Sequence, residues 1–218
     1  MATALQSDNK KGLVGLRRHT DLIRLNSGQL LTLRFAEPED AEALQDYFRR
    51  LSAQSRYSRF LGGISELPRV ELDHFVHAGE LDRFSILATT ATKAGDSNVS
   101  ETIVGEARYG VEATSGKLEF GLSVADGWQG LGVGRVLLSN MECRAAASGA
   151  EAVFGETLRT NTAMIALARK SGYLFSSLPV DGRLVLFEKA LEAPAMPCVT
   201  ARLAAEGLVL SALHSRAI

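Results

Sequence analysis

The chain has 218 residues, enough for one large domain or one domain with appendages. With 46% hydrophobic and 22% charged residues it has an ordinary globular composition, and a formal net charge of −1 gives no field that attracts nucleic acid or an anionic membrane. The N-terminus lacks the apolar region of a signal peptide, and no apolar run reaches the roughly 18 residues of a membrane span. We therefore expect a soluble, cytoplasmic protein without nucleic-acid or membrane partners.

The first half of the chain predicts a hairpin followed by helices. Residues 1–20 are polar with basic patches and no periodicity, which is typical of a flexible leader. Residues 22–25 and 30–34 flank the turn sequence Asn26-Ser-Gly28, so a β-hairpin is expected. The spacing of apolar residues then predicts helices over residues 41–51 and 55–60 and after Pro68.

The second half alternates strands and helices. Strands are expected at residues 83–90, 102–111 and 118–124, with a loop over 94–101. After a glycine-rich turn at 129–135 we expect a helix that ends near Gly149, a strand at 152–157, a helix opened by Asn161 and a strand at 184–189. This order predicts one α/β (α+β) domain with a mixed sheet over residues 21–190. Residues 191–218 are expected to be a C-terminal tail, in which a weakly amphipathic piece over residues 199–214 suits a short helix.

The glycine-rich turn is the most informative stretch, because it joins a predicted strand to a predicted helix. Such a turn exposes several backbone N–H groups at a helix N-terminus, where the helix dipole favours an anion. The dinucleotide fingerprint G-x-G-x-x-G would need glycine at position 135, which is Arg135, and no Lys-Ser/Thr pair follows a glycine as a P-loop requires. The remaining pattern is Q-x-x-G-x-G, from Gln129 to Gly134.

This pattern resembles motif A of the GNAT superfamily of N-acetyltransferases, which bind acyl-coenzyme A. The resemblance extends over residues 29–190, and residues 161–173 (Asn-Thr-Ala-Met through Gly-Tyr) resemble a second element of the family. Residues 51–60 and 104–109 resemble the acetyltransferase domains of bacterial protein-lysine acetyltransferases. The resemblance implies the GNAT fold, a mixed and mostly antiparallel central sheet flanked by helices, with splayed strands at the coenzyme site.

The resemblance also implies the residues that bind acetyl-CoA as cosubstrate, without a metal. The backbone of the strand before the turn would pair with the pantetheine amides, the N–H groups of the turn would hold the pyrophosphate with Arg135 adding charge, and Asn161 would bind the pantetheine arm. A simple tight turn and a plain helix N-cap are the alternative interpretations for the glycines and for Asn161. The implied set is Leu122, Ser123, Val124, Gln129, Gly130, Leu131, Gly132, Val133, Gly134, Arg135 and Asn161.

Acetyl transfer to an amine requires a base, because an alkyl ammonium with a pKa of about 10.4 has no free lone pair at neutral pH. Glu119 is the candidate general base, since it precedes the glycine turn at the spacing at which several family members keep a catalytic glutamate. A glutamate between Leu118 and Phe120 on a central strand would also be costly to bury without a purpose. The alternative is an exposed strand end or a structural salt bridge. Glu156 and Glu106 are weaker candidates.

Two further features bear on the chemistry. The tyrosine that serves as general acid in the family is replaced by Ala168, and Tyr173 is a poor substitute, so no acid is assigned. Arg49, Arg50, Arg56 and Arg59 could steer an acidic substrate or the coenzyme's 3′-phosphate, or could form a solvated helix face.

The sequence therefore predicts an N-acetyltransferase that moves the acetyl group of acetyl-CoA to a primary amine by direct attack. The acceptor is a protein lysine or a small amine. The alternative function, to which Ala168 lends support, is an acyl-CoA sensor module that does not catalyse transfer.

Overall fold

The computed structural model describes residues 20–77, 83–94, 98–111, 117–147, 149–178 and 181–192. The predicted leader and tail fall almost entirely outside these residues, so both stay predictions. The strands form one eight-stranded sheet in the order β1-β2-β3-β4-β5-β6-β8-β7. They are β1 (Asp21–Arg24), β2 (Leu30–Phe35), β3 (Arg83–Ala94), β4 (Asn98–Val111), β5 (Leu118–Val124), β6 (Ala152–Leu158), β7 (Leu174–Ser177) and β8 (Leu184–Ala190).

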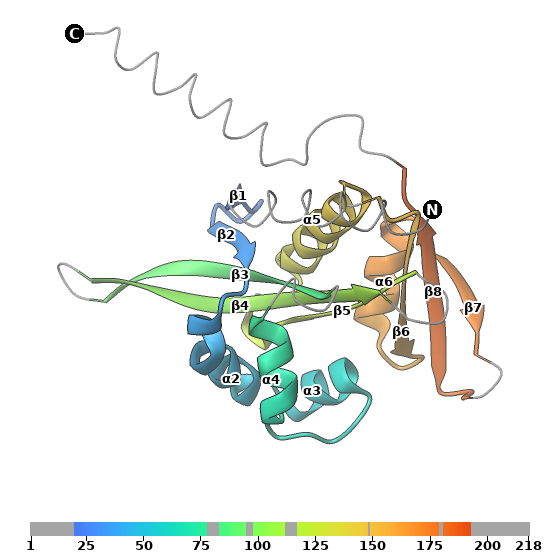
Figure 1. Cartoon of the computed structure of the whole chain (residues 1–218), viewed down its shortest axis with the longest axis horizontal. Coiled ribbons are helices and arrows are strands. Elements are labelled where there is room, and N and C mark those ends of the chain that lie inside the picture. Colours follow the sequence, from blue (N-terminus) through green and yellow to red (C-terminus); the bar gives the residue numbers. More distant parts are fainter. Residues whose placement is uncertain are drawn as a thin grey trace, which may run out of the picture.

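The sheet is mixed and mostly antiparallel, as expected. Every pair of neighbouring strands is antiparallel except β5 and β6, which are parallel. Figure 1 shows α5 on one face of the central strands and α2, α3 and α4 on the opposite face. The helices are α2 (Ala41–Arg50), α3 (Ala53–Phe60), α4 (Arg69–Val76), α5 (Val133–Ala147) and α6 (Thr162–Lys170), with short 3-10 turns η1 (Pro38–Asp40) and η2 (Asp126–Trp128).

Two hydrophobic clusters cover the two faces of the sheet. On the α5 face, Leu137 and Met141 pack with Phe120 of β5 and other strand residues. On the opposite face, Phe48 of α2 and Phe75 of α4 pack against the sheet, with ring centroids 5.4 Å apart. Burial of each such side chain stabilises the fold by about 1.5–3 kcal/mol. The clusters therefore fix the central strands from both sides.

Most predicted elements are confirmed, and two predictions are wrong. The expected loop over residues 94–101 is partly strand, because β4 already begins at Asn98, which pairs with Ala94 of β3. Strand β7 was not predicted at all, since its four residues do not alternate between apolar and polar, although the turn at Gly172 precedes it. The helix stop at Gly149 is confirmed by its left-handed φ of 88°.

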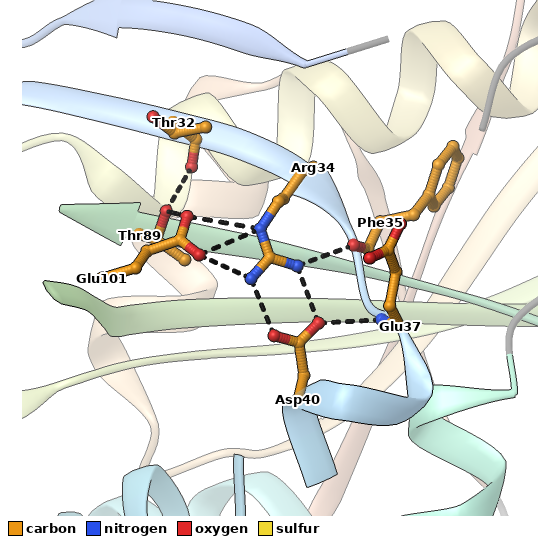
Figure 2. A network of polar contacts seen from close by, with 7 residues as sticks. All are labelled: Thr32, Arg34, Phe35, Glu37, Asp40, Thr89 and Glu101. Atoms are coloured by element: carbon orange, nitrogen blue, oxygen red, sulfur yellow. Dashed lines mark hydrogen bonds and ion pairs between the residues drawn. The ribbon is translucent and has the colours of Figure 1, made fainter. Parts of the chain in front are cut away.

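A polar network ties α2 to the edge of the sheet (Figure 2). Arg34 of β2 donates to both oxygens of Asp40, each at 2.7 Å, and to Glu101 of β4 at 2.7 Å. Burial would raise the pKa of Asp40, but the hydrogen bonds from Arg34 and from the Glu37 N–H outweigh it, so this pKa is lowered. The network fixes the start of α2, and so the helical face that lies over β4 and β5.

Candidate active site

Strands β5 and β6 pair only at their first residues. The parallel ladder joins Leu118 to Val153 and Glu119 to Phe154, and then ends, although β5 remains paired with β4 up to Val124. We call the region beyond Glu119 and Phe154, where the two strands no longer pair, the β5–β6 opening. Its presence agrees with the splayed strands that the family resemblance implies.

The backbone of β5 faces the β5–β6 opening at alternate residues. The N–H of Ala125 donates to the Val104 carbonyl at 2.9 Å, on the β4 side. Because successive strand residues point their backbone groups to opposite sides, those of Ser123 also face β4, and those of Leu122 and Val124 face the opening. Of the three residues expected to pair with the pantetheine, two therefore present backbone groups at the opening.

The glycine turn has the backbone geometry that the sequence predicts. Gly130 and Gly132 adopt φ of 74° and 97°, a region that strains other residues, and α5 begins at Val133. In the described part of the chain, the N–H groups from Gly130 to Arg135 have no hydrogen-bond acceptor. The Arg135 side chain is exposed and forms no ion pair with the described residues. The turn therefore offers N–H donors and one guanidinium to an anion.

Gln129 connects this turn to α3. Its Nε2 donates to the Val124 carbonyl at 3.1 Å and to Ser55 Oγ at 3.2 Å. Asp126 of η2 accepts from the Ser52 N–H at 2.8 Å and from the Ser52 and Ser55 hydroxyls. Burial would raise the pKa of Asp126, but these hydrogen bonds outweigh it and lower the pKa. The N-terminus of α3 is thus fixed to the connection between β5 and α5.

Asn161 forms the N-cap of α6, which is the alternative that the sequence left open. Its Oδ1 accepts from the Met164 N–H at 3.2 Å, and its Nδ2 donates to Thr157 Oγ1 at 3.0 Å. One amide hydrogen and one acceptor position of the side chain are unused by these bonds. The role of Asn161 toward the pantetheine stays a prediction.

Two carboxylates flank the start of the β5–β6 opening. Glu119 is the last β5 residue paired with β6, and its side chain is exposed, which is the alternative that the sequence left open, so the argument from costly burial does not apply. Glu156, two residues beyond Phe154 on β6, is exposed as well. Partial burial raises the pKa of Glu156, and the charge of Glu119 raises it further. The two side chains are therefore close enough to interact electrostatically.

The third candidate base, Glu106, belongs to a buried network instead. Its side chain is fully buried and accepts from Arg59 Nε at 2.7 Å and from the Ser123 hydroxyl at 2.6 Å, while Ser123 Oγ lies 3.0 Å from the Tyr47 hydroxyl. Burial alone would lower the pKa of Arg59, but the charge of Glu106 raises it. Glu106 is thus committed to an ion pair, and Arg59 belongs to neither a solvated face nor a steering patch.

The positions examined for a general acid lie in the core. Ala168 is fully buried, and Tyr173 packs its ring against Phe120 and Phe187 at 5.7 and 5.5 Å between centroids. Burial, followed by the charge of Glu142, raises the pKa of Tyr173. Neither residue offers a proton to the β5–β6 opening. Among the described residues no group of three or more His, Cys, Asp or Glu side chains is arranged to hold a metal.

Comparison with known proteins gives consistent matches. Residues 67–173 match the family model described as Acetyltransferase (GNAT) family. Acetyltransferase PA5475 of Pseudomonas aeruginosa is 29% identical over 167 residues, which cover 77% of this chain and 87% of that protein. In the described part of the chain, no helix combines the length and the apolar character that crossing a membrane requires.

Solved structures share the fold. The GNAT domain of PAT from S. lividans has a TM-score of 0.69 and 24% identity, covering 79% of this chain and 97% of that one. The putative acetyltransferase yncA of Salmonella typhimurium, solved with its cofactor acetyl-CoA, has a TM-score of 0.59 and 21% identity, covering 77% and 97%.

Proposed function

We propose that this chain is an acetyltransferase of the GNAT family, whose model matches residues 67–173, and that it transfers the acetyl group of acetyl-CoA to a primary amine, with Glu119 as general base. The observation that carries the proposal is the end of the β5–β6 ladder after Glu119, on the strand that leads through η2 to the glycine turn. This arrangement combines free strand backbone, free N–H donors and a carboxylate in one region.

The residues present fit acetyl-CoA. The backbone groups of Leu122 and Val124 that face the opening suit the pantetheine amides, as in an added strand. The N–H groups of Gly130 to Arg135 and the Arg135 guanidinium suit the pyrophosphate. A relative of the same fold has been solved with acetyl-CoA. Val124 offers fewer free backbone groups than Leu122 to the pantetheine, because the Val124 carbonyl already accepts from Gln129.

Glu119 takes a proton from the acceptor ammonium, directly or through water. The neutral amine nitrogen then attacks the thioester carbonyl carbon, the carbon–nitrogen bond forms and the carbon–sulfur bond breaks. Coenzyme A leaves as a thiolate and takes up a proton, since neither Ala168 nor Tyr173 reaches the opening to donate one. One proton is released overall. A base of this kind contributes about 10²–10⁴-fold to the rate.

The acceptor is a protein lysine or a small amine. Residues 51–60 support the first possibility by resemblance. They contain the whole of α3, and this helix contacts both β5 and β6. The position of α3 beside the opening does not distinguish a lysine of a peptide from a free amine, so the assay includes acceptors of both kinds.

The proposal is tested by the release of free coenzyme A thiol from acetyl-CoA over a panel of small amines, lysine peptides and protein extract. We expect turnover with at least one acceptor, and a loss of about 10²-fold or more in kcat for Glu119→Gln at pH 7. Glu188→Gln is the matched control, because Glu188 lies on the same face of the sheet and is paired with Lys117. Tight coenzyme binding without thiol release from any acceptor would favour the sensor function instead.

A further inference from the structure

Glu119 and Glu156 lie on the same face of neighbouring strands. Glu119 and Phe154 are partners in the parallel register, and Glu156 follows Phe154 by two residues, so all three side chains point to one face. This face is the one covered by α3, which contacts both β5 and β6. The two carboxylates therefore stand on either side of the point where the β5–β6 opening begins.

Neither carboxylate has a cation of its own. In the described part of the chain, Glu119 and Glu156 form no ion pair and no hydrogen bond through their side chains. Three cations near this face are paired with other carboxylates: Arg59 of α3 with Glu106, Arg108 of β4 with Glu71, and Lys117 with Glu188 of β8. Against its burial, the pKa of Arg59 is raised by the charge of Glu106, to which that of Glu119 adds, but Arg59 Nε and Nη2 bind Glu106 and not Glu119.

Two unpaired carboxylates side by side repel each other, and a bound cation between them removes the repulsion. This repulsion is visible in the raised pKa of Glu156, to which partial burial contributes most and Glu119 adds. An alkyl ammonium is a cation at neutral pH, whereas an aryl amine is neutral. A site of this charge therefore favours an acceptor that arrives protonated.

We propose that Glu119 and Glu156 together receive the acceptor as an alkyl ammonium, with Glu156 as the binding residue that gives preference for a cationic amine over a neutral one. The inference rests on the proposed function and assigns its substrate class. Glu156 holds the ammonium by a charge-assisted hydrogen bond, while Glu119 accepts the proton that must leave before the nitrogen attacks. Transfer then forms the carbon–nitrogen bond and breaks the carbon–sulfur bond, with the coenzyme leaving as thiol.

The kinetic test compares Glu156→Gln with the wild type, using benzylamine as the cationic acceptor and aniline as the neutral acceptor. We expect the KM for benzylamine to rise about tenfold, because the variant loses one charge-assisted hydrogen bond to the ammonium. The KM values for aniline and acetyl-CoA should change less than twofold. Glu156→Asp, which keeps the charge, should recover part of the loss. Glu188→Gln should change none of these values. An equal change for both acceptors, or none for benzylamine, would overturn the proposal.

A binding measurement separates this inference from the proposed function. Titration calorimetry with n-hexylammonium chloride, in the presence of coenzyme A, should show about tenfold weaker binding to Glu156→Gln than to the wild type. Equal binding to both proteins would overturn the cation site even if acetyl transfer occurs. Absence of thiol release from every amine would instead reject the proposed function, and the binding result would still decide whether the two carboxylates form a cation site.

Discussion

Arg59 and Glu106 form a buried ion pair that joins α3 to the central sheet across β5. Arg59 Nε lies 2.7 Å from Glu106 Oε1, and the exposed fractions of the two side chains are 9% and 0%. The guanidinium lies over Gly121, where any side chain would collide with it. Rings of Phe60 and Phe75 lie 5.2 and 5.9 Å from the guanidinium carbon. The pair thus fixes the helix that covers the start of the β5–β6 opening.

Breaking this pair should destabilise the protein strongly. Glu106→Gln leaves the Arg59 charge buried without a counter-ion, which costs about 3–5 kcal/mol of the free energy of unfolding. Urea denaturation measures the loss. The control is Glu71→Gln, which removes the carboxylate that binds Arg108 at a more exposed position and should cost no more than about 1 kcal/mol. Similar losses in the free energy of unfolding for Glu106→Gln and Glu71→Gln would contradict a larger contribution from the buried pair.

The glycine turn should be intolerant of side chains at its left-handed residues. Gly132 has a φ of 97°, so Gly132→Ala strains the turn by roughly 1–2 kcal/mol and turns N–H donors away from the pyrophosphate. We expect the KM for acetyl-CoA to rise about tenfold, with a smaller change in the KM for the amine. Gly127→Ala is the control, because nothing lies within 4 Å of its added Cβ and its φ is not in the left-handed region. A normal coenzyme KM for Gly132→Ala would argue against pyrophosphate binding at the turn.

Asp126 should stabilise α3 at neutral pH only. Burial would raise the pKa of Asp126, but the hydrogen bonds from Ser52 and Ser55 outweigh it, so this pKa is lower in the folded protein than in the unfolded chain. The ionised carboxylate therefore stabilises the fold above the ordinary aspartate pKa. This stabilisation is lost as the pH falls through the pKa of the folded protein. Asp126→Asn should therefore lower the thermal midpoint at pH 7, by an amount equivalent to about 1 kcal/mol for a capping interaction. The difference from the wild type should vanish in acid. Asp46→Asn, at a surface pair with Arg49, should show little effect at either pH.

Glu156 should have the opposite effect on stability. Its pKa is raised on folding, by partial burial first and by Glu119 second, so its ionised form destabilises the folded state above the ordinary glutamate pKa. Below that pKa the carboxyl is protonated in both states and the penalty is absent. We expect Glu156→Gln to raise the thermal midpoint at pH 7 and to leave it unchanged in acid. A lower midpoint at pH 7 would indicate that Glu156 has a stabilising partner.

The sequence predicted those parts of the fold that depend on local patterns. The hairpin of β1 and β2, the strand β5 and the start of α5 each carry a turn residue or a periodicity that identifies them. Strand β7 follows the turn at Gly172 but has no periodicity: Leu174 is 79% exposed, and the strand depends on its pairing with β8, which lies further along the chain. Strand β4 similarly extends back to Asn98 because β3 pairs with it, although its first residues are polar.

The parts of the site that lie within one sequence motif could be predicted, whereas the contacts between residues far apart in the sequence could not. The glycine turn lies within seven residues, and the structure has a turn there, with Gly130 and Gly132 in the left-handed region. The Arg59–Glu106 pair joins residues 47 apart, and Tyr47 meets Ser123 across 76 residues, so no local signal marks them. The sequence left open whether Glu119 is buried or exposed, because alternation along β5 gives the face of a residue but not how far the covering helix reaches.

The most direct test of the central claim is the single-turnover rate of acetyl transfer from acetyl-CoA by Glu119→Gln, measured from pH 6 to pH 10 with a reactive alkyl amine. Without the base, only the free amine reacts, so the rate should rise tenfold per pH unit up to the amine's own pKa of about 10.4. The wild type should be faster by about 10²-fold or more at pH 7, and the two profiles should converge as the pH approaches the pKa of the amine. A Glu119→Gln profile that matches the wild type would contradict the assignment of Glu119 as the base.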